Sequence, residues 1–289
     1  MRTEKKIYDL ILGYAQKDER VRAVTLEGSR VNPNVPKDIF QDFDISYFVT
    51  DMDSFIRDKS WIDIFGERII MQEPEAMSLF PPELNGWYSY LMLFKDGNRI
   101  DLKIIPLEDV DFYIRNDKLI RLLLDKDGFF PPLTSPTDID FHVKRPHEEN
   151  FRDCCNEFWW VSTYVAKGLW RKEILYANAH INGYVRPGLL RMMEWRAGIA
   201  TGFKLSVGKH YKYLQNYIPE EEWMLILQTY RNDNYENCWQ SLFTMTDLFR
   251  ISSRIVAESL NYEYPLEEDE NVTGYLNEVY KSFLNKSTD

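Results

Sequence analysis

Short stretches in the first half of the chain alternate apolar and polar residues, or are apolar throughout, as is typical of β-strands. The predicted strands are residues 21–26, 42–49, 67–71, 87–94 and 99–105. Apolar residues recur instead at helical spacing in three segments, and the predicted helices are residues 3–19, 55–65 and 109–124. The sequence KDGN at residues 95–98 separates the last two strands and predicts a hairpin between them.

The pattern changes after residue 126. Residues 127–137 (DGFFPPLTSPT) have the Gly, Pro, Ser and Thr content of a loop. Beyond about residue 148, Trp, Leu and Tyr recur every three or four positions, which predicts helices almost to the end of the chain. We therefore predict an α+β protein of two domains, with an α/β domain at residues 1–140 and an all-helical domain at residues 141–289.

Charge and cysteine content narrow the class of protein. The formal net charge is −11, from 35 basic against 46 acidic residues, which argues against a nucleic-acid partner and suits a small cationic one. Three cysteines, an odd number with one adjacent pair, form neither a disulfide framework nor a CxxC metal motif. We find no signal peptide and no apolar run of eighteen residues, so we expect a cytoplasmic protein with no membrane partner. The sequence leaves the oligomeric state open.

Two carboxylates stand close together in the predicted strand QDFDI. Because side chains alternate faces along a strand, Asp42 and Asp44 share one face and Phe43 takes the other. Asp101, in the later strand RIDL, joins them if the two strands are neighbours. Converging carboxylates repel one another unless a cation compensates them, and Mg²⁺ is commonly held by carboxylates together with substrate phosphates. We therefore predict a metal site at Asp42, Asp44 and Asp101, although each alone would be an ordinary solvated charge.

A glycine-containing turn follows the first predicted strand. Gly28 permits a tight turn and the close approach of a ligand. Backbone N–H groups here and the Ser29 hydroxyl can hold phosphate oxygens. Arg30 can form a fork with a phosphate or pair with a nearby acid, and the sequence does not choose between the two. This turn is a candidate nucleotide-binding element.

The order of these features is a strand, Gly-Ser, a loop, an Asp-x-Asp strand and a third Asp on a later strand. It resembles the signature of the nucleotidyltransferase superfamily, which includes the polymerase-β-like enzymes. The whole chain, in particular LEGSR (26–30), QDFDISYFV (41–49), RIDL (99–102) and KHYKYL (209–214), resembles the streptomycin-type aminoglycoside 6-adenylyltransferases.

The resemblance implies an enzyme that transfers AMP from ATP to the hydroxyl at position 6 of streptomycin, releases pyrophosphate and gives antibiotic resistance. It also implies Mg²⁺, a nucleotidyltransferase domain with a mixed sheet, and a helical domain that binds substrate and nucleotide, with the substrate in the cleft between the domains. Asp101 is then either the third metal ligand or the general base, and the sequence leaves both roles open.

Further site residues are expected in the helical domain. Lys209 resembles the triphosphate-contacting lysine of related adenylyltransferases, and Lys212 is the second candidate; the structural alternative for both is an exposed helix start. A guanidinium-bearing drug requires a carboxylate and an aromatic face, for which Glu194 and Trp87 are the candidates. The alternative for Glu194 is a salt bridge with a neighbouring arginine.

Other functions remain open at this point. The same fold acts on other acceptors, such as RNA or a protein hydroxyl, although the acidic balance disfavours RNA. A non-catalytic, antitoxin-like binding partner is expected to have lost carboxylates, whereas all three are present here. An Asp-x-Asp glycosyltransferase needs a larger nucleotide-sugar domain and leaves the Gly-Ser turn unexplained.

Overall fold

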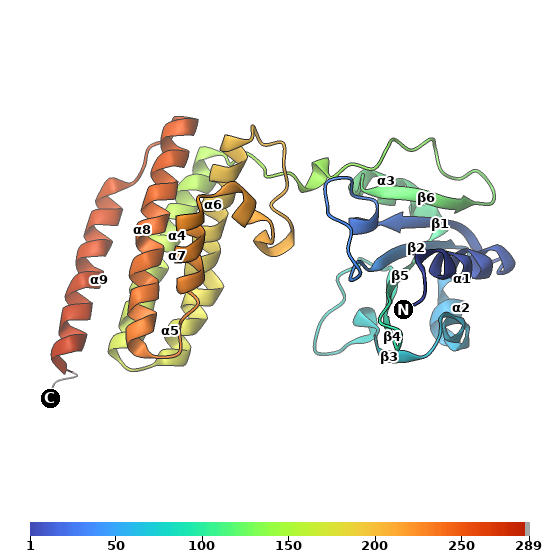
Figure 1. The fold of residues 1–289 in the computed structure, drawn as a ribbon, viewed down its shortest axis with the longest axis horizontal. Helices are drawn as coiled ribbons and strands as arrows, with labels where there is room; N and C mark the ends of the chain where they lie inside the picture. The colour runs from blue at the N-terminus through green and yellow to red at the C-terminus, as the bar shows by residue number, and fades with distance from the viewer. Residues whose placement is uncertain (287–289) are drawn as a thin grey trace. The chain divides into compact units, whose positions relative to one another are not determined.

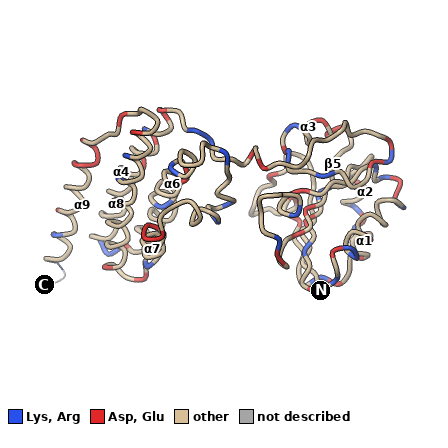
Figure 2. Tube along the Cα trace, turned by 45° about the horizontal axis from the view of Figure 1, so that its top comes forward, with Lys and Arg blue, Asp and Glu red and all other residues tan. Residues whose placement is uncertain are grey.

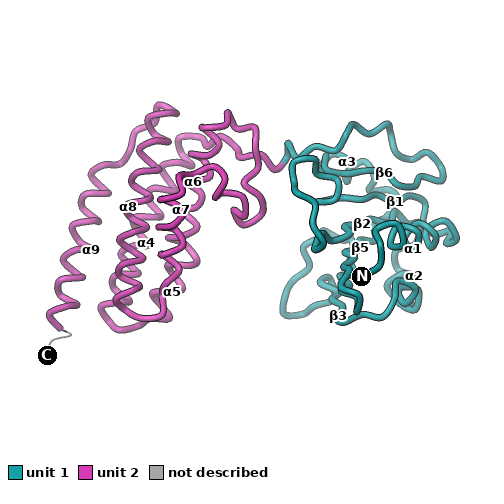
Figure 3. The backbone as a smooth tube through the Cα atoms, viewed as in Figure 1, with its two compact units in different colours: residues 1–140 teal, residues 141–289 magenta. Residues whose placement is uncertain are grey.

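The computed structural model describes residues 1–286 and divides into two compact units. The first is Met1–Asp140 and the second begins at Phe141 (Figure 3). Each unit has a buried core of its own. No helix among the described residues combines the length and the apolar composition that are needed to cross a bilayer. The three cysteines are buried and free.

A six-stranded mixed sheet organises the first unit (Figure 1). The strand order is β3-β4-β5-β2-β1-β6, in which only the central pair β2 and β5 is parallel. The strands are β1 (Val21–Glu27), β2 (Phe43–Val49), β3 (Arg68–Gln72), β4 (Tyr88–Phe94), β5 (Arg99–Pro106) and β6 (Ile120–Asp125).

Helices cover both faces of this sheet. Helices α1 (Glu4–Lys17) and α2 (Met52–Arg57) lie on the face to which Phe43 and Tyr47 point. Helix α3 (Val110–Asn116) covers part of the other face, where Tyr113 packs edge-on against Phe48 at 5.0 Å between ring centroids. Because both faces are covered, the central strands are apolar along most of their length, and charged residues gather where β2 and β5 begin.

Two predicted helices differ from the structure. The segment 109–124 was expected to be one helix, and this is wrong: α3 ends at Asn116, and the chain continues as β6 along the open edge of β1. The apolar run at residues 119–124 fits a strand as well as a helix, and pairing with β1 decides for the strand. The segment 55–65 splits into α2 and a 3₁₀ turn (Ser60–Phe65), because the Asp58 carboxylate accepts from the Ser60 amide at 2.9 Å and stabilises a turn.

The second unit is helical, as predicted. Three glutamates occupy the first turn of α7, where the helix dipole favours negative charge (Figure 2). A π-helical turn joins α5 to α6, and the segment from Thr201 to Pro219 between α6 and α7 is mostly irregular. The helices are α4 (Glu148–Trp170), α5 (Ile174–His180), α6 (Arg186–Ala200), α7 (Glu220–Gln228), α8 (Tyr235–Leu260) and α9 (Leu266–Lys286). The α+β fold class is confirmed.

One buried ion pair connects α8 to α9. The Asp269 side chain accepts from Nε and Nη2 of Arg250 at 2.7 Å each, and from the Tyr264 hydroxyl at 2.8 Å. We expect Asp269→Ala to lower the free energy of unfolding by about 3 kcal/mol, because it leaves a half-buried guanidinium without its main partner. Urea denaturation measures this loss.

Asp247→Ala is the matched control. Asp247 also pairs with Arg250, at 2.9 Å, but its side chain is 70% exposed, so its removal should cost at most about 1 kcal/mol. Equal losses in the two variants would contradict the buried pair as the stabilising contact.

Candidate active site

The parallel pairing of β2 with β5 brings two of the predicted carboxylates together. Asp44 lies directly opposite Asp101 in the register, one residue after Phe43 pairs with Ile100. Asp42 immediately precedes β2 at the same end of the sheet. Residues 57 positions apart in the sequence thus share one short stretch at the start of the two central strands.

An arginine that the sequence analysis did not single out neutralises part of this charge. Arg99 donates from Nε and Nη2 to the two oxygens of Asp101, at 2.7 Å each. Its Nε also lies 3.7 Å from Oδ2 of Asp42. Burial raises the pKa of Asp42, and the guanidinium of Arg99 opposes this rise. A cationic group therefore already lies between two of the three carboxylates.

Asp44 has the most perturbed carboxyl group of the three. Its pKa is raised to about 7, first by burial and then by repulsion from Asp101, Glu27 and Asp42. Lys103 opposes the shift. A carboxylate held ionised at neutral pH in these surroundings costs free energy unless a cation binds beside it.

Behind Asp44 lies a buried ion pair. Glu27 is 5% exposed and faces Asp44 across β1 and β2. Its carboxylate accepts from Nζ of Lys103 at 2.6 Å and from the Ser46 hydroxyl. Burial lowers the pKa of Lys103, but the Glu27 carboxylate outweighs it and the net shift is upward. This pair keeps one positive charge beside Asp44.

The turn after β1 closes tightly on the carboxylates. Gly28 has φ of +70°, and a Cβ at this position would collide with Oδ2 of Asp44 and lie 3.1 Å from its Cγ. The Ser29 hydroxyl has no hydrogen-bond partner within residues 1–286, so it is free to meet a ligand. Arg30 instead donates to the backbone carbonyls of Asp42 and Gln41, at 2.9 and 2.7 Å.

The Arg30 guanidinium also stacks on Phe43, 3.6 Å from the ring centroid. These contacts show that Arg30 has a structural role. It fixes the chain that leads into β2. Its Nη1 also lies 3.6 Å from Oε1 of Glu4, so Arg30 pairs with a nearby acid, which is one of the two roles that the sequence left open.

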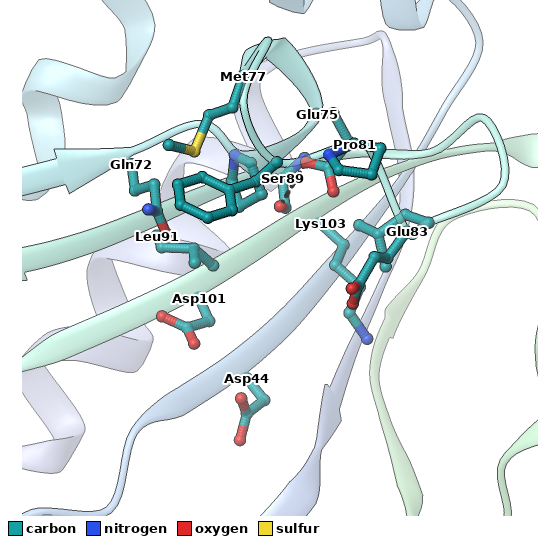
Figure 4. A pocket seen from close by; sticks show the side chains of 13 residues that line it. Asp44, Gln72, Glu75, Met77, Pro81, Glu83, Ser89, Leu91, Asp101 and Lys103 are labelled. Carbon is teal, nitrogen blue, oxygen red and sulfur yellow. Dashed lines mark hydrogen bonds between the residues drawn. The ribbon is translucent and has the colours of Figure 1, made fainter. Parts of the chain in front are cut away.

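A pocket of about 480 Å³ opens beside Asp44 and Asp101 (Figure 4). The two carboxylates and Lys103 lie on one side, on β2 and β5. The segment between β3 and β4 supplies much of the remaining wall, with Glu75, Glu83 and several apolar side chains. The sequence analysis missed these wall residues, because the loop that carries them shows no regular pattern.

Trp87, the predicted aromatic contact for the drug, is not among the residues that line this pocket. Its indole N–H donates to Asp109 at 2.8 Å, and its ring packs edge-on against Phe112. These contacts anchor α3 against the sheet. Phe80 is the aromatic residue among those that line the pocket.

The remaining predicted residues belong to the second unit. Lys209 and Lys212 are exposed; Lys209 begins a short 3₁₀ segment (Lys209–Tyr211) that is kinked at His210, and Gly208, His210 and Tyr211 all have positive φ. Glu194 is half-buried on α6, and burial raises its pKa against the effect of nearby Arg191.

The chemistry of these carboxylates fits a divalent cation whose shell is completed by other ligands. No group of three or more His, Cys, Asp or Glu side chains within residues 1–286 is arranged to hold a metal ion unaided. Asp44 and Asp101 supply two converging carboxylates, and burial together with the repulsion from Asp101 raises the pKa of Asp44. Mg²⁺ typically takes one or two carboxylates and completes its shell with water and substrate phosphates, which is what this pair offers.

A mixed sheet with a Gly-Ser turn beside paired carboxylates on two parallel strands defines a nucleotidyltransferase. A family model described as streptomycin adenylyltransferase matches residues 1–279. The chain therefore belongs to the streptomycin adenylyltransferase family, and the predicted resemblance is confirmed. This membership supports adenylyltransferase activity with ATP as co-substrate.

Curated relatives agree with the family model over nearly the whole chain. An aminoglycoside 6-adenylyltransferase of Bacillus subtilis (strain 168) is 50% identical, covering 98% of this chain and 99% of its own. One of Campylobacter jejuni is 53% identical, covering 96% and 95%. A crystal structure of an aminoglycoside 6-adenyltransferase from B. subtilis is 47% identical, with a TM-score of 0.48 over 97% of this chain and 99% of that chain.

We expect Gly28→Ala to reduce transfer activity at least tenfold, because the added methyl group displaces Asp44 and the positive φ becomes strained. The strain should also lower the free energy of unfolding by about 1–3 kcal/mol. Gly13→Ala is the control: its Cβ meets nothing within 4 Å in α1, so stability should stay equal or rise by up to about 1 kcal/mol. Steady-state kinetics and urea denaturation measure both effects.

A second prediction follows from the raised pKa of Asp44. A folded-state pKa near 7 against 3.8 in the unfolded chain means that stability falls as pH rises between these values. In EDTA at pH 8, Asp44→Asn should therefore be more stable than the wild type, by roughly 1–2 kcal/mol after allowance for solvent screening. The gain should disappear towards pH 4 in thermal unfolding. If the stability of the variant relative to the wild type were lower at pH 8 than at pH 4, the raised pKa of Asp44 would be contradicted.

Proposed function

We propose that the protein is an aminoglycoside adenylyltransferase that transfers AMP from ATP to the hydroxyl at position 6 of streptomycin. The transfer releases pyrophosphate, requires Mg²⁺ and gives resistance to the antibiotic. The family membership and the carboxylate site of the first unit support this proposal. We expect it to act in the cytoplasm, where ATP is available and the buried thiols stay reduced.

The observation that carries the proposal is the register that sets Asp44 opposite Asp101 beside the Gly-Ser turn. Asp42 and Asp44 would hold Mg²⁺, which supplies positive charge to bind the triphosphate and stabilise charge on the reacting phosphate. The Ser29 hydroxyl and the turn would bind phosphate oxygens. Lys209, with Lys212 as second candidate, would contribute a cation from the helical unit, and Glu194 would bind the drug.

Asp101 would be the general base, because it lines the pocket beside Asp44. One of its two oxygens would have to leave Arg99 to accept the proton. In the proposed reaction the drug hydroxyl oxygen forms a bond to the α-phosphorus of ATP. The bond from that phosphorus to the bridging oxygen breaks, pyrophosphate leaves, and the hydroxyl proton passes to Asp101. The protein mainly positions the two substrates and compensates charge.

The direct test mixes the purified protein with ATP, Mg²⁺ and streptomycin and searches by mass spectrometry for the drug plus one AMP. Kanamycin and a short RNA are the parallel acceptors. A streptomycin adduct that disappears with EDTA supports the proposal. AMP found on the RNA would favour the alternative of another acceptor, and ATP binding without any product would favour a non-catalytic binding protein.

We expect Asp42→Asn, Asp44→Asn and Asp101→Asn each to lower transfer by at least about a hundredfold, since each removes a charge from the site. Circular dichroism should show that all three stay folded. Asp111→Asn, an exposed change on α3, is the control and should keep wild-type activity. Retained activity in Asp42→Asn or Asp44→Asn would contradict the assignment of these residues to a metal site.

A further inference from the structure

The pocket beside the carboxylate pair carries an unbalanced charge. Its acidic lining residues are Asp44, Asp101, Glu75 and Glu83, and Lys103 is the basic residue of the lining. Arg99 pairs with Asp101, so the acids without an ion-pair partner among the described residues are Asp44, Glu75 and Glu83. Lys103 is already bound to Glu27, which does not line the pocket. Closely spaced charges of one sign in a concave site attract a ligand of the opposite sign. The pocket is therefore set up for a cationic group.

Within residues 1–286 no lysine or arginine pairs with either glutamate of the wall, although acidic residues near them have cations. Glu73 pairs with Lys59 at 2.6 Å, and Glu67 pairs with Lys95. Glu75 accepts through one oxygen only, from the amide and hydroxyl of Ser89 at 2.9 and 2.7 Å. Its other oxygen has no hydrogen-bond or ion-pair partner in the described part of the chain.

Glu83 makes neither a hydrogen bond nor an ion pair with any residue from 1 to 286. Figure 4 shows its carboxylate on the same side of the pocket as Lys103, with Glu75 and Ser89 further along the wall. The free oxygens of both glutamates are available to a ligand. The pairing of Glu75 with buried Ser89 holds one of the two carboxylates in place before any ligand binds.

The same wall presents apolar surface that the core does not use. Phe80 lines the pocket and is 59% exposed, and Met77 lines it beside Gln72 (Figure 4). A large aromatic side chain left exposed next to carboxylates suits a planar cation, which can stack on the ring while its N–H groups bind the acids. A guanidinium has this shape and a primary ammonium does not.

We infer that Glu75 and Glu83, with Phe80, determine acceptor specificity by binding a guanidinium group of the aminoglycoside. The inference rests on the proposed function and adds the residues and the chemical group by which that function selects its acceptor. The group would occupy the wall of the pocket while the acceptor hydroxyl lies towards Asp101 on the other side. Neither Glu194 nor Trp87 lines this pocket.

Direct binding tests the inference without depending on transfer. Isothermal titration calorimetry without ATP would measure the affinity of the full chain for two drugs. Streptomycin carries guanidinium groups, and kanamycin carries ammonium groups. Glu75→Gln and Glu83→Gln keep the side-chain shape and remove the charge. Each substitution should lower the affinity for streptomycin about tenfold, which corresponds to a loss of about 1.4 kcal/mol in binding free energy. Glu108→Gln, an exposed glutamate outside the pocket, should bind like the wild type.

Phe80→Leu separates the aromatic contribution from the charge. It should lower the affinity for streptomycin several-fold and leave the affinity for kanamycin unchanged, because only the planar cation stacks on the ring. Thermal unfolding checks that every variant is folded, and the KM for ATP should stay at the wild-type value.

The outcomes separate this inference from the proposed function. Wild-type affinity in both folded glutamate variants would overturn the inference, as would a wild type that binds kanamycin more tightly than streptomycin. Tight streptomycin binding that both variants lose supports it. If that pattern appears but the wild type yields no adenylylated drug, the inference stands and the proposed reaction fails.

Discussion

The parallel pairing of β2 with β5 is the constraint on which the site depends. It sets Asp44 opposite Asp101 in a sheet whose neighbouring residues, Phe43 and Ile100, are fully buried. A shift of the register by one residue would turn these apolar side chains out of the core. The packing of the core therefore fixes the spacing of the two carboxylates, and the repulsion between them is maintained by the stability of the sheet.

Around this pair the protein compensates charge in two different ways. Arg99 binds Asp101 from the exposed side, and Lys103 is held by Glu27 from the buried side. Neither cation reduces the pKa of Asp44 to its ordinary value. The folded protein is therefore destabilised at this site, and a bound cation would relieve the destabilisation.

The sequence was sufficient to predict the central strands, the hairpin, the helical second half and the set of carboxylates, because these depend on local periodicity and on residue type. It failed at residues 109–124, where an apolar run satisfies both helix and strand and only the open edge of β1 decides. The role of Arg30 was also open, since its partners are two backbone carbonyls and the distant Glu4, and no sequence pattern reveals these contacts.

By itself, the sequence determined which chemistry is available: carboxylates on strands, a glycine turn and an acidic surface. The tertiary structure decided which of these groups meet. It placed Arg99 on Asp101, and in the part of the chain that the structure describes it left Glu75 and Glu83 without a cationic partner in a pocket that Phe80 also lines. The physical reason is that pairing between strands and the folding of a loop over a sheet join residues far apart in the chain, and such contacts leave no periodic trace in the sequence.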